Sequence, residues 1–229
     1  MTSSGTYSFG LSNADIVTGA FDRIGVRRTS LLAEHMISGY RQANLALVKL
    51  SNLQPNLWTE ETQEVALVEG TATYTLEART IMVLIATTRT GSDTTQNDRV
   101  LGPLSAIEYQ SIPNKASEGV PSVYWFNRQI TPQITLWYVP DASSTYTLRL
   151  QTVRQVQDAN LTGGETPDLP YRWLDWFEAE IAARLARIWK PELEMERKKD
   201  AAEAWQVAAV QDTENVSMAI VPGLSGYYR

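Results

Sequence analysis

The 229-residue sequence contains no cysteine, and its only histidine is His35. Without thiols the chain has neither disulfides nor thiolate metal sites, and its redox compartment need only be compatible with synthesis in the cytosol. A single histidine excludes multi-histidine metal sites and histidine-based proton shuttles. Because His35 falls within a predicted helix, we expect it to have a structural or surface role. The sequence therefore predicts no metal site.

Motifs typical of nucleotide-binding proteins and hydrolases are also missing. The chain has no Walker-type phosphate loop, no Gly-x-Gly-x-x-Gly fingerprint and no Gly-x-Ser-x-Gly elbow. Glu178 and Glu180 are two residues apart on a predicted helix, so their carboxylates diverge and cannot converge across a sugar as a glycosidase requires. We interpret such acidic residues as solvated helix faces. No catalytic residue and no cofactor is predicted, and we expect the chain not to be an enzyme.

Long apolar runs and clusters of basic residues are absent as well. Nowhere do about 18 apolar residues follow one another, and the first ten residues lack the apolar segment of a signal peptide. We therefore expect a soluble chain with no membrane partner. Twenty basic against twenty-six acidic residues give a formal charge of -6, and the one basic run, 197–199, lies among acidic residues. Because affinity for phosphates needs clustered cations, the sequence predicts no specific DNA binding.

Helical periodicity occurs at both ends of the chain. One helix is predicted over 12–25, with Ser12 or Asn13 as its N-cap, and a second over 29–52. The second helix has a principal apolar face and a second apolar edge that contains Leu45 and Val48. We therefore expect it to pack on more than one neighbour.

The C-terminal part of the chain predicts two more helices. The first begins at 168–170, where a proline suits the first turn, and ends at Lys190-Pro191. The second covers about 191–212 and changes from charged to apolar along its length. Residues 216–229 follow as a short tail, which is either a frayed end or an arm that orders only against a partner.

The middle of the chain has the period-two alternation of β-strands. Within 119–153, the alternation occurs three times, over 123–126, 134–139 and 146–151, and the breaks between them contain turn residues. We interpret these segments as three antiparallel strands of a meander. Before them, the sequence predicts a hairpin over 64–76, a buried strand over 81–86, a polar loop over 91–98 and a short helix within 103–112.

The predicted fold class is α+β: a helical bundle built from the N- and C-terminal helices, with an inserted antiparallel β-rich lobe. The expected parts are 1–56 for the N-terminal helices, 57–157 for the β-rich lobe, 158–213 for the C-terminal helices and 214–229 for a C-terminal arm. At this length the chain can bury roughly 70% of the surface that it exposes when unfolded, enough for one large domain or two small ones.

Seven tryptophans are the unusual feature of the composition. We expect most of them in the core or on strand faces. Trp176, on the less apolar side of its helix, and whichever of Trp125 and Trp137 faces away from the core are candidate interface anchors. The end of the C-terminal arm supplies further candidate contacts, namely Tyr227, Tyr228 and Arg229.

The strand-rich middle also resembles a known family. The resemblance extends from about Leu57 to Pro170. The segments that carry it are Ser111-Ile112-Pro113-Asn114-Lys115, Gly119-x-Pro121, Tyr124, Arg128-Gln129-Ile130-Thr131-Pro132 and Leu136-Trp137-x-Val139-Pro140-Asp141. In these segments the chain is similar to the head-to-tail adaptor proteins of short-tailed bacteriophages, also called tail accessory or tail tubular proteins. It departs from their pattern at Asn127, where an acidic residue is expected, and at Tyr138, where proline is expected.

The resemblance implies a structural virion protein at the head–tail junction, made in the host cytoplasm. Such a protein forms a ring with copies of itself, twelvefold in the relatives, below the portal protein. It connects the portal to a tail or nozzle protein, and DNA passes through its channel without specific binding. Alternative interpretations are another phage tail or head-completion protein, or a carbohydrate-binding module that uses Trp125 or Trp137.

Overall fold

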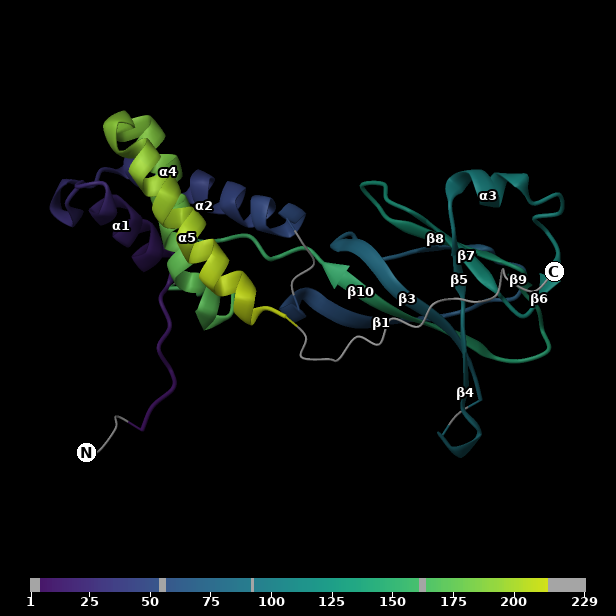
Figure 1. The fold of residues 1–229 in the computed structure, drawn as a ribbon. Helices are drawn as coiled ribbons and strands as arrows, with labels where there is room; N and C mark the ends of the chain where they lie inside the picture. The colour runs from purple at the N-terminus through teal and green to yellow at the C-terminus, as the bar shows by residue number, and fades with distance from the viewer. Residues whose placement is uncertain (1–4, 54–56, 92, 161–163, 214–229) are drawn as a thin grey trace, which may run out of the picture.

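The computed structural model describes residues 5–53, 57–91, 93–160 and 164–213, and it has two lobes (Figure 1). Helices from the two ends of the chain form one lobe, and the strands from the middle of the chain form the other. The predicted α+β fold, with helical ends and a central β-rich lobe, is confirmed.

The first two helices largely follow the predicted pattern. α1 (Asn13–Arg23) has Ser12 as its N-cap, whose hydroxyl accepts a hydrogen bond from the backbone N–H of Asp15, and the chain leaves the helix through Gly25 at a positive φ of 77°. α2 spans Ala33–Leu53 and begins later than expected. The preceding residues form a short 3₁₀ turn, η1 (Arg28–Ser30), instead of the first turn of α2.

The break between the two C-terminal helices lies at the predicted position, Lys190-Pro191. A 3₁₀ turn, η4 (Tyr171–Trp173), leads into α4 (Leu174–Trp189). A second turn, η5 (Pro191–Leu193), carries the proline at its start and leads into α5 (Glu194–Gln211). The reversal at Lys190-Pro191 lets α5 fold back against α4.

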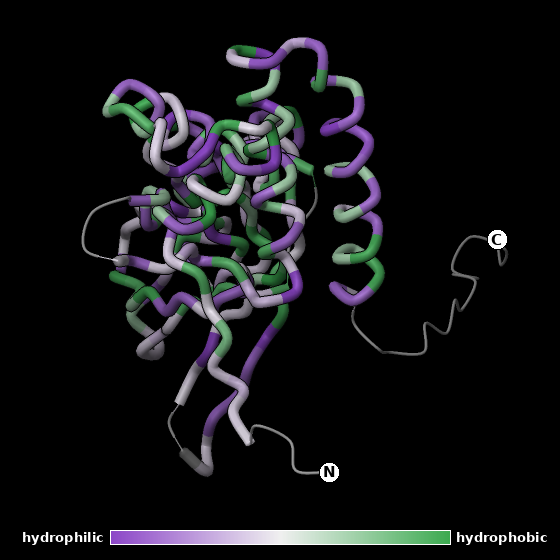
Figure 2. The backbone as a smooth tube through the Cα atoms, turned by 90° about the vertical axis from the view of Figure 1, so that its left-hand side faces the viewer, coloured by the Kyte–Doolittle hydropathy of each residue, from purple (hydrophilic) through white to green (hydrophobic). Residues whose placement is uncertain are grey.

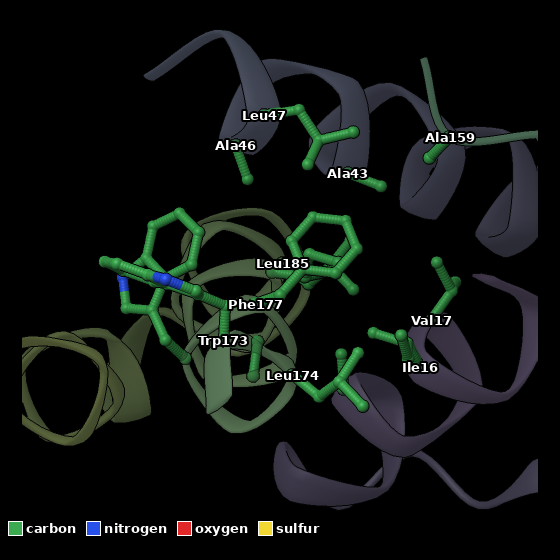
Figure 3. Close-up of a cluster of buried hydrophobic side chains, with 14 of the residues drawn as sticks. Ile16, Val17, Ala43, Ala46, Leu47, Ala159, Trp173, Leu174, Phe177 and Leu185 are labelled. Carbon is green, nitrogen blue, oxygen red and sulfur yellow. The ribbon is translucent and has the colours of Figure 1, made fainter. Parts of the chain in front are cut away.

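α4 lies at the centre of the helical lobe, with α1, α2 and α5 around it (Figure 3). Trp173, the last residue of η4, is fully buried, and so is Phe177, one turn further along in α4 (Figure 3). Side chains of α1 and α2 meet this surface, among them Val17 and Leu47 (Figure 3). One apolar cluster therefore joins the two ends of the chain.

The β lobe contains two four-stranded sheets and a two-stranded parallel pair. The first sheet has the order β1 (Glu60–Ala66), β10 (Tyr146–Arg154), β3 (Thr80–Thr90) and β4 (Asn97–Val100). The second has the order β2 (Thr73–Thr75), β8 (Gln133–Trp137), β7 (Val123–Asn127) and β5 (Gly102–Leu104). The parallel pair is β6 (Glu118–Gly119) with β9 (Val139–Pro140). Within the four-stranded sheets, all pairs are antiparallel except β5 with β7.

Three short helical turns or helices complete the β lobe: η2 (Leu57–Thr59), η3 (Asp93–Thr95) and α3 (Ala106–Ser111). The short helix predicted within 103–112 is confirmed as α3. Ser105 and Glu108 close a capping box at its start, because each side chain binds the other residue's backbone N–H.

The two four-stranded sheets share one apolar core. Leu148 and Leu150 of β10 and Ile134 and Leu136 of β8 are fully buried, and they belong to the same cluster although they lie in different sheets. Tyr124 of β7 joins them from the second sheet. The alternation of inward and outward side chains along each strand therefore builds a two-layer β lobe.

The predicted strand pairing is wrong in two places. The three strands predicted as a meander exist, but only β7 and β8 pair with each other, and β10 pairs with β1 and β3 in the other sheet. The predicted hairpin over 64–76 does not form either, since β1 and β2 lie in different sheets. Alternation specifies which side of a strand is buried but not which strand lies beside it.

The strand predicted over 81–86 exists as part of β3, but the prediction that this run is buried is wrong, because Ala86 is its only buried residue. Leu84 and Ile85 are exposed, with 38% and 54% of their surface accessible, whereas Ala86 is buried. Only one face of an antiparallel sheet has to pack on a second layer, so apolar side chains on its other face can stay exposed.

We predict that Gly39→Ala destabilises the helical lobe. A methyl group at Gly39 would lie 2.3 Å from Cγ1 of Val17, a fully buried and stiff side chain of α1. The overlap should lower the free energy of unfolding in urea by about 1–3 kcal/mol, although alanine favours helix formation. Ser38→Ala is the control and should be neutral or stabilising; a Gly39→Ala variant as stable as this control would contradict the close approach of α1 and α2.

Candidate interface surfaces

Acidic side chains of α4 form ion pairs with the neighbouring helices. Arg23 of α1 binds Glu178 and Asp175, each at 2.7 Å. Glu180 accepts hydrogen bonds from Lys49 of α2 at 2.9 Å and from Arg184 at 2.8 Å, and only 9% of its side chain is exposed. The interpretation of Glu178 and Glu180 as solvated faces is therefore wrong. The pattern of charges on one helix gave no signal for partners supplied by the other end of the chain.

The two lobes are joined by hydrogen bonds around Asp168. Its carboxylate forms an ion pair with Arg154 of β10, with the shortest contact at 2.5 Å. It also accepts a hydrogen bond from the backbone N–H of Gln157 at 3.1 Å. Its backbone carbonyl accepts a hydrogen bond from the indole N–H of Trp58 at 3.2 Å. Asp168 thus ties together the last strand of the β lobe and both chain segments that lead to the helices.

Trp125 and Trp137 both lie on the side of β7 and β8 that faces away from the shared core. Trp125 stacks on Tyr109 of α3, with ring centroids 5.5 Å apart. Trp137 stacks on Tyr138 at 3.9 Å, and its indole N–H donates to the carbonyl of Asn114 at 3.0 Å. Both indoles are half-buried, because neighbouring rings cover part of their surface. Their role as interface anchors stays a prediction.

Trp176 occupies a different environment from the one expected. Its side chain is 1% exposed and belongs to the helical core, where it packs at a right angle to Trp173. The placement of Trp176 on a free side of its helix is therefore corrected, since α5 covers that side. Tyr227, Tyr228 and Arg229 lie outside the described residues.

α2 has a second apolar face that no described residue of the chain covers. Ile37 is 70% exposed, and Leu45 and Val48 are 45% and 44% exposed. Tyr40, one turn after Ile37, is also exposed, at 42%. The sequence analysis predicted Leu45 and Val48 as a second apolar edge of this helix, but it did not predict the exposed Ile37.

α5 also exposes apolar side chains, and these were missed in the sequence. Val207 and Val210 are 70% and 74% exposed. Glu203 lies one turn before them, with 65% of its side chain exposed. In Figure 2, α5 stands at the edge of the molecule, where its outward side is open. The sequence analysis missed these valines because it took the apolar part of this helix, which is rich in alanine, as a single buried face.

An open cleft of about 400 Å³ lies between α2, α4 and α5. Its lining combines apolar and charged side chains. The lining residues are Lys49, Leu53, Trp176, Glu180, Lys198, Ala201, Ala202, Trp205 and Gln206. Among the charged lining residues, Lys49 and Glu180 bind each other, and Lys198 binds Glu194.

His35 is a packing residue. Its Nδ1 accepts the backbone N–H of Leu32 at 3.0 Å, and its ring contacts those of Phe21 and Trp189. Within residues 5–53, 57–91, 93–160 and 164–213, no three His, Asp or Glu side chains gather to hold a metal ion. None of the helices described there is long and apolar enough to cross a membrane.

We predict that Glu180→Gln destabilises the protein far more than Glu203→Gln. The first change leaves Lys49 and Arg184 without their shared carboxylate in a largely buried place, at a cost of about 1–3 kcal/mol. The second breaks an exposed pair with Lys199, at 3.8 Å, and should cost less than about 0.5 kcal/mol. Urea unfolding of both variants measures the difference, and equal losses would contradict the structural role of Glu180.

We also predict that the contribution of Glu194 to stability disappears in acid. Hydrogen bonds from Lys198 and then Arg187 lower the pKa of Glu194, so its contribution is complete above the ordinary pKa of glutamate. It is lost as the pH falls through the lowered pKa. Glu194→Gln should therefore be less stable than the wild type at about pH 7, and the two should become equally stable once the pH has fallen below the lowered pKa of Glu194. A stability difference that persists in acid would show that the ion pairs are not its source.

A comparison with protein families identifies the chain. No curated protein matches the sequence. The model of the SU10 adaptor protein family matches residues 19–217, which include all of α2, the whole β lobe and both C-terminal helices. The chain belongs to the SU10 adaptor protein family.

Proposed function

We propose that the chain is a head-to-tail adaptor that forms a ring below the portal protein of a tailed bacteriophage. The family name denotes an adaptor protein, and the match of its model over 19–217 is the observation that carries the proposal. In the proposed assembly, twelve copies surround the DNA channel at the head–tail junction. The ring contacts the portal on one side and a tail or nozzle protein on the other.

The two-lobe shape supports a role in connecting two partners. The helical lobe and the β lobe lie at opposite ends of the long dimension of the molecule (Figure 1). Contacts around Asp168 hold the two lobes together, so that a load on one lobe can pass to the other. A protein that connects two larger assemblies needs a separate binding surface for each of them, and these surfaces must keep a fixed position relative to one another.

The exposed helix faces support self-association in the helical lobe. Leu45 and Val48 on α2 and Val207 and Val210 on α5 form apolar surfaces next to charged side chains. Apolar groups arranged in this way are typical of surfaces that bind other proteins. Since the two surfaces lie on different helices, neighbouring copies can meet through unlike surfaces, which is the kind of contact that closes into a ring.

The net charge supports passage of DNA without binding. The chain carries a formal charge of -6. A channel lined by a neutral or acidic surface does not displace the counterions of the duplex and so gives the DNA no affinity for the wall. A cationic lining would slow the passage of the genome.

The carbohydrate-binding alternative has less support. A sugar needs an open aromatic face, but Trp137 stacks on Tyr138 and uses its indole N–H within the chain. Trp125 stacks on Tyr109. We instead propose Trp125 and Trp137 as contacts for a protein on the tail side, where their remaining exposed edges can pack against a partner.

We propose that the C-terminal arm reaches the portal, with Tyr227, Tyr228 and Arg229 as its contacts. Two tyrosines supply a large contact area at low cost in side-chain entropy. Deleting 216–229 should leave the fold intact and abolish docking on the portal. Normal docking of the shortened chain would contradict this role.

The ring is tested by mixing the full chain with the portal protein and measuring mass. Twelve copies of the 25.6-kDa chain should add about 300 kDa to the portal in one step, without stable intermediates of a few copies. Electron microscopy of the product should show a closed ring on one end of the portal. A chain that stays apart from the portal, or that binds as a single copy, would contradict the proposal.

A further inference from the structure

Two exposed stripes on different helices have the same spacing. The α2 stripe consists of Ile37, Arg41, Leu45 and Val48, and the α5 stripe consists of Lys199, Glu203, Val207 and Val210. Within each stripe the residues are separated by steps of four, four and three, which keep them on one side of a helix. Each stripe is about 17 Å long, at 1.5 Å of rise per residue.

Both stripes are exposed along their whole length. All eight side chains belong to exposed residues, and the inward sides of the two helices carry the buried residues. α2 faces α4 through Ala43 and Leu47, whereas α5 faces it through Ala201 and Ala208. The stripes therefore point away from the helical core and are open to another molecule.

The charges of the stripes are complementary in one orientation only. In a parallel pairing, Arg41 lies opposite Glu203, while Leu45 and Val48 lie opposite Val207 and Val210. The aliphatic stem of Lys199 then covers Ile37. An antiparallel pairing places Arg41 against Val207 and sets Glu203 near Leu45, so that each charge meets an apolar side chain.

The two charged residues can change partners at little cost. Arg41 has no ion-pair partner among the residues that the structure describes. Glu203 binds only Lys199 there, at 3.8 Å, and both of these side chains are highly exposed. An exposed pair of this kind contributes little to stability, so Glu203 can bind a cation of another chain.

The directions of the helices favour the parallel pairing. In Figure 1, α2 runs from left to right with a slight descent and α5 descends more steeply from the upper left, so the two helices are oblique but both have their C-terminal ends toward the lower right. Neighbours in a ring of many copies are related by a small rotation, so the two helices keep the same general direction when they belong to adjacent copies. α5 of one copy and α2 of the next then meet side by side without a reversal.

We propose that the contact between copies is a parallel packing of the α2 stripe on the α5 stripe of a neighbouring copy, with Arg41 and Glu203 as an ion pair. This inference rests on the proposed ring, and it specifies the surface, the orientation and the register of its subunit contact. Because the two stripes differ, the contact is heterologous and can close into a ring.

Disulfide trapping tests the register, and the absence of cysteine from the natural chain makes every trapped bond an engineered one. Leu45→Cys and Val207→Cys, mixed as two single variants of the full chain at high concentration and oxidised, should give a disulfide-linked dimer. The double variant L45C/V207C should give a ladder of linked copies. Cβ atoms must come within about 4.5 Å for the bond to form, so trapping reports a specific contact.

The matched control is the pair Ile37→Cys and Val210→Cys, which meets only in the antiparallel orientation. The parallel packing predicts at least about tenfold less dimer from this control than from the first pair. More dimer from the control, or equal amounts from the two pairs, would overturn the proposal. No dimer from the first pair under conditions in which a ring forms on the portal would also overturn it.

A charge exchange tests the ion pair. Arg41→Glu and Glu203→Arg should each lower the association constant between copies about fivefold or more, because each places like charges opposite one another. The combined variant should recover most of this loss. Arg128→Glu and Glu69→Arg are controls on exposed residues of the β lobe and should leave association unchanged. Additive losses in the combined variant would contradict the pairing.

The outcomes separate this inference from the proposed function. A ring that forms on the portal while the first cysteine pair stays unlinked contradicts the stripe contact and leaves the adaptor role intact. Trapping in the parallel register without any ring supports the stripe contact and contradicts the ring. Trapping of linked copies within a ring supports both.

Discussion

The burial of α4 is the constraint on which the rest of the structure depends. Ten of its sixteen residues are buried, so a helix apolar on most of its circumference must be surrounded by other elements. Its neighbours come from both ends of the chain: α1 and α2 on the N-terminal side, and α5 after a proline reversal. The N- and C-terminal helices can therefore fold only together.

This arrangement also determines how the β lobe is attached. The chain leaves the helical lobe after α2 and returns after β10, and Asp168 binds groups at both connections through Arg154 and Trp58. The β lobe is consequently held at two points and not by a single linker. Such an attachment suits a protein that joins two larger assemblies, because the two lobes then keep a defined orientation.

The sequence predicted the elements better than their partners. Ser12, Gly25 and Pro191 act within a few residues of their own position, so the helix ends they specify could be predicted. The pairing of β10 with β1 and β3 could not, because alternation carries no information about which strands become neighbours. The buried state of Trp176 and Glu180 depends on α2 and α5, which lie far away in sequence. The exposed valines of α5 escaped notice for the same reason, since only the packing on α4 shows which side of α5 is free.

Native-state hydrogen exchange of the full chain tests the central claim most directly. If both ends of the chain close on α4, the backbone amides of 177–186 should exchange only through global unfolding, with the same opening free energy as protected amides in α1. Lower protection in 177–186 than in α1, or an α1 that opens while α4 stays protected, would show that the two ends do not form one cooperative lobe.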